Sequence, residues 1–478
     1  MILREVRDPI PPEPVTDGSF WQFTADPADC MRRLRAAHGE IAALRDGGQQ
    51  VIFVFSPRLN HAVLSDTQAY HARFFGIRGP RNSAQRRLTS GLLSMNDEQH
   101  KRQRRLLMGS FSRKAIDGYH PRLIESVETM LADWRAGQTR DVYRDMTALM
   151  LRITSTILFG FDQSELSCEI GRKIERWVGM NHQLGIGALV PDEYFTRHYE
   201  ELLGLAGELE KDIQQMIDLK RREPTPAHDM LSILIAAHDE QGGMTDEELI
   251  GQACVLFGAA HLTSAATLGW TLLLLAQHPR VTAELLAEFQ AVLGGRVPQL
   301  EDLDRMPVLE RVIKESMRVL PASSYSQRMT TQPVELGPFR LPPRTPVVFS
   351  PLITHHLPEL YDEPERFRPD RWIGLNPSPY AYLQFGAGPR LCLGSSLAMM
   401  TFKVALPMIL QRFRVSSVPG CEINALVQST MLTPTTPLLL KIDRHDGTLE
   451  SHSICGTIHN LVTFPAAEKY QCPLGCRF

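Results

Sequence analysis

The stretch that decides the fold is Phe-Gly-Ala-Gly-Pro-Arg-Leu-Cys-Leu-Gly at 385–394, where a single cysteine lies in a glycine-rich loop. Three positions lack a Cβ atom and let the backbone turn tightly and approach a flat partner closely: Gly386, Gly388 and Gly394. A helix is predicted directly afterwards, at Ser395–Phe413. Its first N–H groups, together with Arg390, favour a thiolate over a thiol at Cys392. A lone thiolate in such a loop suits an axial ligand to haem iron.

The composition is that of an ordinary globular protein, with 478 residues of which 43% are hydrophobic and 22% charged. This excludes a disordered or fibrous chain, and the net charge of −3 argues against a nucleic-acid binder. The eight cysteines are too sparse for a disulfide scaffold and indicate a reducing, cytoplasmic location. The N-terminal segment mixes charges with prolines, and we expect neither a signal peptide nor a membrane anchor.

The chain shows no internal repeat and no Gly/Ser-rich linker, so we expect one domain over residues 1–445. A hairpin is predicted at Ile41–Leu44 and Val51–Phe55, around an Asp-Gly-Gly turn. From 97 to 293 apolar residues recur at three- and four-residue steps, which indicates helices. Short strands alternate with Pro- and Gly-rich loops after Pro321. Residues 446–478 lack clear periodicity and are expected to form an irregular tail. The predicted fold class is mainly α with a smaller β portion.

One uncharged segment, Leu249–His278, is long enough to span a bilayer. It also contains polar side chains and lies in the middle of the chain, so we interpret it as a helix buried in a large domain. Thr245-Asp-Glu-Glu248 is a capping box that predicts the start of this helix. Pro279 predicts its end.

The cysteine loop resembles the haem-thiolate signature of the cytochromes P450, Phe-x-x-Gly-x-Arg-x-Cys-x-Gly, with every fixed position filled. The resemblance covers about residues 20–445. It implies the P450 fold, with a long central helix over a buried haem b, and it makes Cys392 the iron ligand. Phe385, Gly388 and Gly394 would lie against the haem. A structural cysteine or a hydrolase nucleophile are the alternatives for Cys392, and the second lacks a paired His and Asn.

Two further segments match the family in the required order. A three-residue step places Glu315 and Arg318 on one helix face, where their charges can pair. Alone, this is a weak signal, because such pairs are common on protein surfaces. Arg371 matches the third member of the family's Glu-Arg-Arg cluster, and Arg366 is the less favoured alternative. The resemblance implies a buried cluster that fixes the loop before Cys392.

Four basic residues match the family's ligands for the haem propionates. His100 and Arg104 are four residues apart on one predicted helix face, Arg328 follows Arg318 by ten residues, and Arg390 lies in the cysteine loop. Two carboxylates need several cationic donors, and a guanidinium group can bind them through two hydrogen bonds. Each of these residues, taken alone, could equally be an ordinary surface charge. The prediction of propionate ligands rests on all four occurring in the family's order and spacing.

The family's central helix usually reads (Ala/Gly)-Gly-x-(Asp/Glu)-Thr-(Thr/Ser), and residues 259–264 here read Ala-Ala-His-Leu-Thr-Ser. Thr263 is retained. The resemblance therefore implies that its hydroxyl is catalytic, binding oxygen or water and helping to deliver protons. A threonine in mid-helix also commonly donates to the carbonyl one turn earlier, which bends the helix.

Two positions of this helix depart from the family pattern: Leu262 replaces the acid and Ala260 replaces the glycine. Leucine cannot relay a proton, so protons would arrive through His261, Ser264 or solvent, or the chemistry would differ. Three hypotheses stay open. The first is a monooxygenase that uses O2; the second is an enzyme of the same fold that uses peroxide or another oxidant, or that carries out a non-hydroxylating oxidation. The third is a haem-binding sensor without turnover.

Substrate contacts are predicted only from the regions that the family uses. The candidates are Phe257, Ala260, Leu262, Ala322, Tyr325 and Met431. Such side chains suit a largely apolar small molecule, which we place in secondary metabolism. The loop at 75–93 carries four arginines that would suit a carboxylate on the substrate: Arg78, Arg81, Arg86 and Arg87.

Electrons are expected from a separate protein, because the sequence shows no flavin or iron–sulfur motif. Basic residues from Arg102 to Lys114 are predicted on the cysteine side of the haem, where they could dock an acidic ferredoxin or flavodoxin with its reductase. A solvated run of charges is the alternative. Cys455, Cys472 and Cys476 have poor spacing for zinc, and we predict no metal site there.

Overall fold

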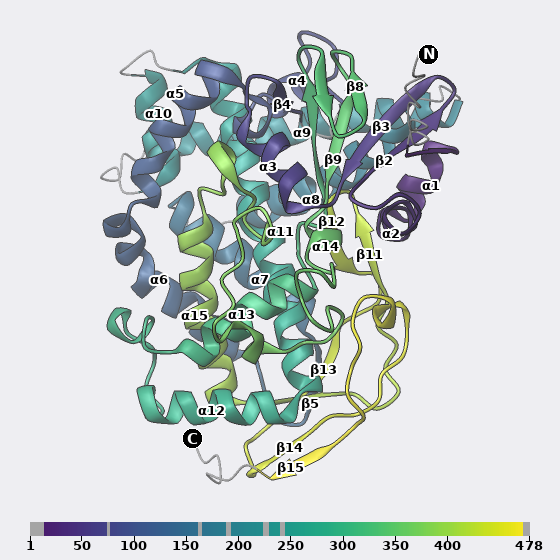
Figure 1. Cartoon of the computed structure of the whole chain (residues 1–478). Coiled ribbons are helices and arrows are strands. Elements are labelled where there is room, and N and C mark those ends of the chain that lie inside the picture. The colour runs from purple at the N-terminus through teal and green to yellow at the C-terminus, as the bar shows by residue number, and fades with distance from the viewer. Residues whose placement is uncertain are drawn as a thin grey trace, which may run out of the picture.

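The computed structural model describes residues 14–73, 77–160, 165–187, 193–222, 229–239 and 244–471. Helices make up the larger part of the molecule, and the main sheet lies to one side of them near the N-terminal segment (Figure 1). The α-helices are α1 (Phe20–Ala25), α2 (Pro27–His38), α3 (Pro57–Ser65), α4 (Ala84–Leu88), α5 (Asp97–Met108), α6 (Arg113–Ala132), α7 (Val142–Ile153), α8 (Glu165–Gly187), α9 (Glu193–Arg222), α10 (Met230–Asp239), α11 (Asp246–Gln277), α12 (Pro279–Leu293), α13 (Pro307–Val319), α14 (Pro351–Thr354) and α15 (Ser395–Arg412).

The strands form one larger sheet and several small ones. They are β1 (Val15–Asp17), β2 (Ile41–Asp46), β3 (Gln49–Val54), β4 (Tyr70–Ala72), β5 (Gln138–Asp141), β6 (Ser326–Thr330), β7 (Val334–Leu336), β8 (Phe339–Leu341), β9 (Pro346–Phe349), β10 (Arg414–Ser417), β11 (Ala425–Gln428), β12 (Met431–Pro434), β13 (Leu439–Asp443), β14 (Thr448–Glu450) and β15 (Lys469–Gln471). The six-stranded sheet has the order β1-β2-β3-β9-β6-β4, and β10-β13-β5 form a three-stranded sheet. The predicted fold class, mainly α with a smaller β portion, is confirmed.

The predicted hairpin is formed by β2 and β3, which pair antiparallel from Ile41 opposite Val54 to Asp46 opposite Gln49. The turn between them contains two glycines with positive φ, of 52° and 85°. β3 also pairs in parallel with β9, which brings the N-terminal hairpin beside residues 346–349. The sheet therefore joins two distant parts of the chain.

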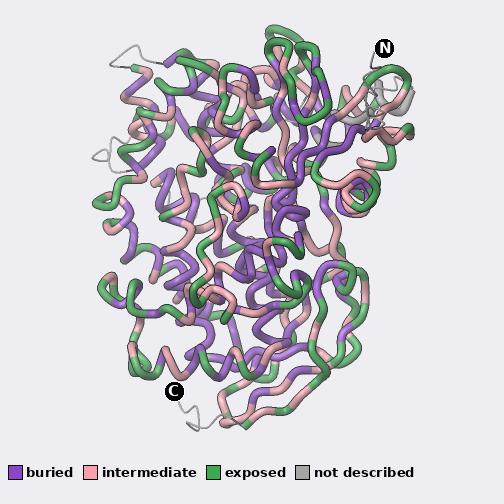
Figure 2. Tube along the Cα trace, in the orientation of Figure 1, coloured by how far each residue is buried: buried purple, intermediate pink, exposed green. Residues whose placement is uncertain are grey.

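The central helix α11 runs through the helical part of the molecule, and nearly all of it is buried (Figures 1 and 2). Its first turn carries the predicted capping box: Thr245 Oγ1 accepts from the Glu248 N–H (3.2 Å), and Glu248 Oε2 accepts from the Thr245 N–H (3.0 Å). Among the described residues α11 is the helix with the length and apolar composition of a membrane span. However, 72% of its most apolar window is buried, so it is a core helix.

The C-terminal segment differs from the irregular tail expected from the sequence. Over its described part, to residue 471, β14 and β15 pair with each other, and five apolar side chains join the main core: Leu449, Ile454, Ile458, Leu461 and Val462. The Thr463 N–H also donates to the Glu365 carbonyl (2.9 Å). These apolar residues follow neither a helical nor a strand period, which is why the sequence pattern did not reveal their burial. Cys472 and Cys476 lie outside the described residues.

Candidate active site around Cys392

Backbone hydrogen bonds hold the cysteine loop in a compact turn. The Cys392 N–H donates to the Phe385 carbonyl (2.9 Å), and the Gly386 N–H donates to the Leu383 carbonyl (2.8 Å). Gly388 has a φ of +70°, and a Cβ atom there would lie 2.6 Å from the Leu64 carbonyl oxygen. Only glycine fits this position without strain, because the backbone conformation and the close approach both exclude a side chain. The loop is thereby packed directly against α3.

The Cys392 sulfur lies at the start of α15, where opposing effects act on its pKa. Burial raises the pKa of the thiol, whereas hydrogen bonds from the backbone N–H groups of Gly394 and Ser395 and the charge of Arg104 lower it. Desolvation by the surrounding protein is the larger effect, so the pKa is raised overall, although Cys392 keeps exposed surface. This differs from the sequence-based expectation, which assigned the favourable charge to Arg390. Coordination to a metal would supply the missing positive charge, because a coordinated thiol is deprotonated.

Four predicted propionate ligands converge beside the loop. His100 and Arg328 are 7% and 8% exposed. Burial lowers the pKa of His100 to about 4, with further lowering by Arg390, Arg104 and Arg328. Burial also lowers the pKa of Arg328 to about 9, and Arg390 lowers it further. These mutual effects show that the four basic groups, which come from α5, β6 and the cysteine loop, lie close together.

The arginines of this group are held by neutral oxygens. Arg104 Nη2 donates to the Leu391 carbonyl (2.7 Å), Arg328 Nη1 to the Gln327 carbonyl (2.9 Å), and Arg390 Nη2 to Asn96 Oδ1 (2.7 Å). None of the three forms an ion pair with a carboxylate among the described residues. The buried Nε of Arg390 has no hydrogen-bond partner within the part of the chain that the structure describes.

This donor set fits a group that carries carboxylates. Arg328 is buried, and Arg104 and Arg390 lie partly buried near it. Clustering guanidinium groups in this way is costly unless negative charge is bound beside them, and two propionates would supply that charge. The residues present therefore fit a haem, with the sulfur of Cys392 on one side and His100, Arg104, Arg328 and Arg390 around the propionates.

The structure brings the Glu-Arg-Arg cluster together in the protein interior. Glu315 and Arg318 are both fully buried, and Arg318 Nε and Nη2 donate to the two carboxylate oxygens of Glu315, each at 2.9 Å. Arg371 Nε donates to Glu315 Oε1 (2.8 Å). Arg366 contributes only its carbonyl, which accepts from Arg318 Nη2 (3.0 Å), and its side chain is exposed. Arg371 thus occupies the position that the sequence assigned to it.

Thr263 lies on α11 with its hydroxyl donating to the Ala259 carbonyl one turn earlier (3.1 Å). Ala259 is exposed and Thr263 is partly exposed, although α11 is otherwise mostly buried. His261 is turned into the core: it is 1% exposed, and its Nδ1–H donates to the Phe257 carbonyl (2.8 Å). Burial lowers the pKa of His261. The imidazole is therefore neutral and buried, whereas Thr263 keeps accessible surface.

The predicted substrate contacts divide into two groups. Met431 lies beside Ser323 in an isolated bridge, and the Leu432 N–H donates to the Ala322 carbonyl (3.0 Å), so the segments at 322 and 431 lie side by side. Ala260 and Met431 are partly exposed. The other candidates are buried, and two of them pack against aromatic rings: Phe257 against Phe159 and Tyr325 against Phe23. Leu262 and Ala322 are 7% and 9% exposed.

The four arginines of the loop at 75–93 differ in exposure and in ion pairing. Arg87 forms an ion pair with Glu210, donating from Nη2 to Oε2 (2.7 Å). Arg78 and Arg81 are exposed, and Arg86 is partly exposed. The start of this loop, at Phe75, lies outside the described residues.

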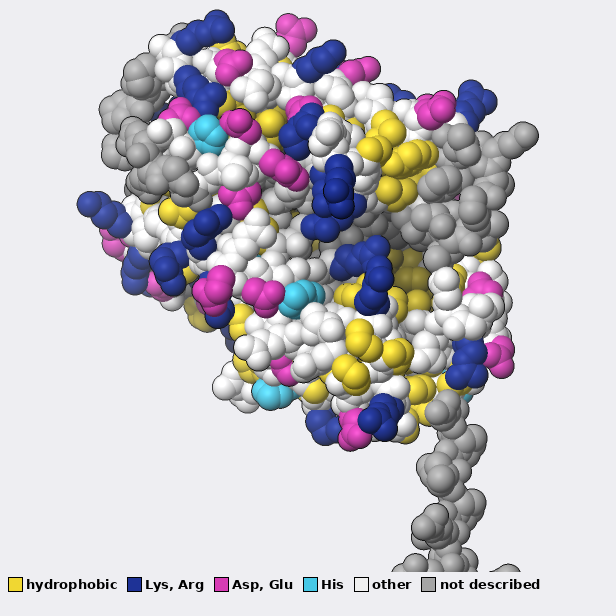
Figure 3. Space-filling model, turned by 90° about the horizontal axis from the view of Figure 1, so that it is seen from above, with side chains coloured by type: hydrophobic (Ala, Val, Ile, Leu, Met, Phe, Trp, Pro, Cys, Tyr) yellow, Lys and Arg dark blue, Asp and Glu magenta, His cyan; other side chains and the backbone are white. Residues whose placement is uncertain are grey.

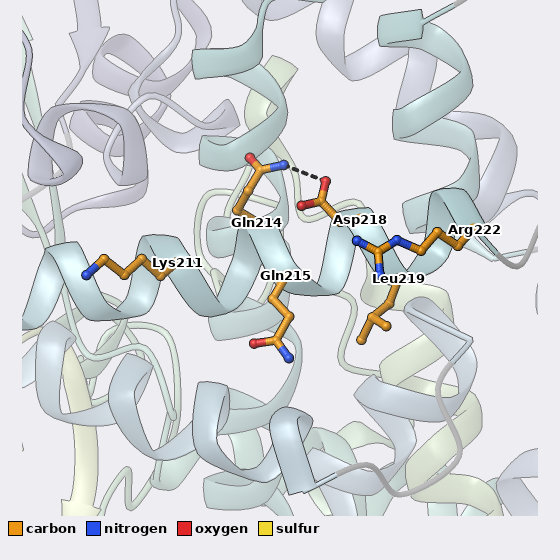
Figure 4. Close-up of a pocket in the computed structure, with 6 residues that line it drawn as sticks. All are labelled: Lys211, Gln214, Gln215, Asp218, Leu219 and Arg222. Carbon is orange, nitrogen blue, oxygen red and sulfur yellow. Dashed lines mark hydrogen bonds between the residues drawn. The ribbon is translucent and has the colours of Figure 1, made fainter.

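Seen from above, the molecule is hollowed, with hydrophobic side chains inside the hollow and Lys and Arg side chains beside it (Figure 3). A separate open groove of about 330 Å³ runs along α9. It is lined by Lys211, Gln214, Gln215, Asp218, Leu219 and Arg222 (Figure 4). All of these belong to one helix, and none is a predicted site residue.

Sequence reasoning missed two residues that hold the site together. Trp372 Nε1 donates to Glu315 Oε2 (2.9 Å), and the only available signal was its position directly after Arg371. His355 Nε2 accepts from the Leu383 N–H (2.7 Å) at the base of the cysteine loop. No periodicity or motif in the sequence marked His355.

Comparison with known proteins agrees with this geometry. The family model "Cytochrome P450" matches residues 10–442. Cyclooctatin synthase of Streptomyces melanosporofaciens is 33% identical over 83% of this chain and 87% of its own length. Pentalenene oxygenase of Streptomyces avermitilis is 29% identical over 87% of this chain and 93% of its own. Cyclooctat-9-en-7-ol 5-monooxygenase of S. melanosporofaciens is 31% identical over 80% and 84%.

A solved structure, retinoic acid-bound cyanobacterial CYP120A1, superposes with a TM-score of 0.75. It covers 87% of this chain and 94% of that one at 24% identity, a likeness that shows the fold. The family match spans the cysteine loop, the basic residues beside it and the Glu-Arg-Arg cluster. The chain belongs to the cytochrome P450 family and is a P450 monooxygenase.

Proposed function

We propose that this enzyme inserts one oxygen atom from O2 into an apolar small molecule of secondary metabolism, with haem b as its cofactor. The observation that carries the proposal is the convergence of His100, Arg104, Arg328 and Arg390 beside the Cys392 loop. This arrangement supports a haem whose iron is bound by sulfur and whose propionates are bound by cations.

The substrate proposal is an unsaturated carbon skeleton with few polar groups. The names of two relatives, pentalenene oxygenase and cyclooctat-9-en-7-ol 5-monooxygenase, specify an alkene and an unsaturated alcohol. Candidate contacts in this chain, such as Leu262 and Met431, are likewise apolar. Apolar walls with few polar groups are typical of sites for such ligands.

Different residues of the chain would have different roles in the proposed reaction. Bound haem supplies the activation of oxygen, and the protein supplies binding, orientation and protons. His100 and the three arginines would hold the propionates, the cysteine loop would orient the sulfur, and the apolar residues would exclude water around the substrate. The Thr263 hydroxyl would hold a proton or a water at the accessible side of α11.

Leu262 favours a second candidate, an enzyme of this fold that uses peroxide or another oxidant, or that oxidises without hydroxylation. In the usual pattern an acid precedes the threonine. Here the only other titratable side chain nearby in sequence, His261, is buried and bonded to Phe257. Turnover driven by a ferredoxin system is to be compared with turnover driven by hydrogen peroxide alone. The second candidate would be favoured if turnover with hydrogen peroxide is faster than turnover with the ferredoxin system. It would also require that Leu262→Glu does not speed the ferredoxin-driven reaction.

A carboxylate on the substrate is a narrower proposal that rests on Arg81 and Arg86. Arg87 is already paired with Glu210, which makes Arg87→Ala a matched control. If the substrate is anionic, Arg81→Ala and Arg86→Ala weaken its binding in a spectral titration, and neutral analogues bind all variants equally. If both variants bind the anionic substrate as tightly as wild type, the proposal that the substrate carries a carboxylate is wrong.

We further propose a cytoplasmic enzyme that receives electrons from a ferredoxin or flavodoxin with its reductase. Arg104 on α5 contacts the Leu391 carbonyl, so α5 borders the cysteine loop, and Arg105 on the same helix is exposed. Lys101 and Arg102 are paired with Glu98 and Glu248. Arg105→Glu is expected to slow reduction by an acidic partner, and the effect should shrink as salt is raised.

The absorption spectrum of the reduced, carbon monoxide-bound protein tests the haem-thiolate assignment. Wild-type protein is expected to show the thiolate band, and Cys392→Ser is expected to lose it while retaining the fold. Failure of wild-type protein to bind haem would overturn the proposal. Haem binding with no product from either oxidant system would favour the sensor.

A further inference from the structure

One buried histidine connects the Glu-Arg-Arg cluster to the cysteine loop. His355 directly follows α14 and is fully buried. Its carbonyl oxygen accepts from Arg318 Nη1 (2.8 Å), and its Nε2 accepts from the Leu383 N–H (2.7 Å). The same residue therefore contacts the cluster through its backbone and the loop through its side chain.

Two backbone hydrogen bonds connect the segment after Leu383 to the backbone of Cys392. The Leu383 carbonyl accepts from the Gly386 N–H (2.8 Å), and the Phe385 carbonyl accepts from the Cys392 N–H (2.9 Å). Leu383 is 1% exposed, so its N–H has no access to bulk water. A buried N–H that loses its acceptor is left with the full cost of desolvation.

Aromatic rings fix the orientation of the imidazole. The ring of Tyr382 lies 5.3 Å from that of His355, and Tyr361 lies 6.5 Å away in an edge contact. Arg318 also lies over the Tyr361 ring, at 5.1 Å from its centroid. The His355 ring thus has little freedom to turn away from Leu383.

We propose that His355 is a positioning residue for the haem-thiolate loop, acting by accepting the Leu383 N–H at the point where the loop begins. The inference rests on the proposed haem site. It assigns to His355 the alignment of the Cys392 sulfur rather than contact with substrate or cofactor.

The imidazole has to be neutral for this role, because a protonated ring has no lone pair to accept with. Burial, the charge of Arg318 and the neighbouring His356 hold the pKa of His355 well below its usual range. The bond therefore persists at neutral pH.

The test compares substitutions at two adjacent histidines. His355→Phe keeps a ring but removes the acceptor, whereas the amide oxygen of His355→Gln can still accept from Leu383. His356 is the matched control, because its Nδ1 bonds the Leu352 carbonyl (2.7 Å) within its own turn and does not reach the loop. His356→Phe makes the same His-to-Phe substitution at the neighbouring residue.

The first measurement is amide hydrogen exchange of the peptide covering 383–394 in protein freed of haem. The second is the fraction of the reduced carbon monoxide complex that shows the thiolate band. We expect His355→Phe to speed exchange of this peptide by about tenfold and to lower the thiolate fraction. In His355→Gln, both the exchange rate of this peptide and the thiolate fraction should be close to those of wild type. His356→Phe should match wild type in both measurements.

Equal exchange in His355→Phe and wild type would overturn the proposal, and so would equal effects of His355→Phe and His356→Phe. If His355→Phe does not fold, the exchange rates of His355→Gln and His355→Asn are compared instead. The Asn amide is one bond shorter than Gln and would not reach Leu383, so equal exchange in these two variants also overturns it. Failure of wild-type protein to bind haem would remove the proposed function, and the exchange comparison without haem would still report on His355.

Discussion

Thr263 carries the hydroxyl from which proton delivery would start. Its Oγ1 donates to the Ala259 carbonyl at 3.1 Å, and both residues keep accessible surface. We expect Thr263→Ala to lower product per electron consumed and to raise peroxide release. The expected loss is about 10²-fold, the lower end of the contribution of a positioned proton donor, because solvent can supply part of the protons. Product and hydrogen peroxide are quantified in the same reaction.

Thr267 provides the control for this prediction. It lies one turn later on α11, donates to the Thr263 carbonyl (3.0 Å), and is 6% exposed. Thr267→Ala removes a similar hydroxyl that is buried, and we expect coupling close to wild type. Equal losses in both variants would mean that the loss is not specific to the accessible Thr263 hydroxyl, which would contradict the prediction.

Gly388 is the residue at which the cysteine loop touches α3. A Cβ there would lie 2.6 Å from the Leu64 carbonyl oxygen, and φ is +70°. We expect Gly388→Ala to lower the free energy of unfolding by about 3 kcal/mol, from backbone strain and overpacking together. Gly386 has a φ of +71° with nothing within 4 Å of a Cβ, so Gly386→Ala should cost about 1 kcal/mol. Chemical denaturation of both variants measures the difference, and equal values would exclude a role for the Leu64 contact.

At the scale of the element, α11 depends on its capping box and on the contacts that the box makes. Glu248 closes the box and also accepts from Gln99 Nε2 (2.8 Å) and Arg102 Nη2 (3.2 Å) of α5. Thr245→Ala is expected to lower the free energy of unfolding by about 1 kcal/mol. Thr245→Ser should keep the cap and lose little. Thermal unfolding distinguishes them, and identical midpoints for the two variants would show that the cap hydroxyl is dispensable.

At the scale of the whole molecule, the segment beyond residue 445 is part of the core. Ile458 is fully buried, so Ile458→Ala is expected to cost about 2–5 kcal/mol through lost burial and the cavity left behind. Lys469 is exposed, and Lys469→Ala should be neutral. Urea denaturation of the two variants tests this. An unchanged stability of Ile458→Ala would restore the expectation of a loose tail.

Acid should destabilise the whole molecule through imidazoles that are buried or partly buried in the folded chain. Burial lowers the pKa of His356 to about 3 from an ordinary value of 6.5, and that of His261 and His278 in the same direction. Between pH 6.5 and 3 the unfolded chain therefore binds more protons than the folded chain. The free energy of unfolding falls as pH falls, by about 1.4 kcal/mol per pH unit for one fully depressed imidazole. His356→Gln should flatten the curve measured by denaturation at several pH values, and an unaltered slope would contradict this.

Local patterns were enough to predict several elements, whereas the Glu-Arg-Arg cluster was expected only from the family resemblance. The capping box and Pro279 delimit α11 within a residue or two, because caps and prolines act within one turn. Glu315, Arg318 and Arg371 meet in one buried cluster, and the family resemblance supplied Arg371 because no local rule links positions 53 residues apart. The pairing of β3 with β9 follows no local rule either.

The sequence by itself determined the cysteine loop, since its glycines and its cysteine act through backbone freedom and sulfur chemistry that belong to those residues alone. It also determined the uncharged composition of the central helix and the residues at which that helix begins and ends. Tertiary structure decided what depends on neighbours from elsewhere in the chain. Desolvation of the Cys392 sulfur outweighs the helix N–H groups, Arg87 is taken up by Glu210, and His355 bridges Arg318 and Leu383. Burial and through-space contacts are properties of the assembled fold, and no single segment contains them.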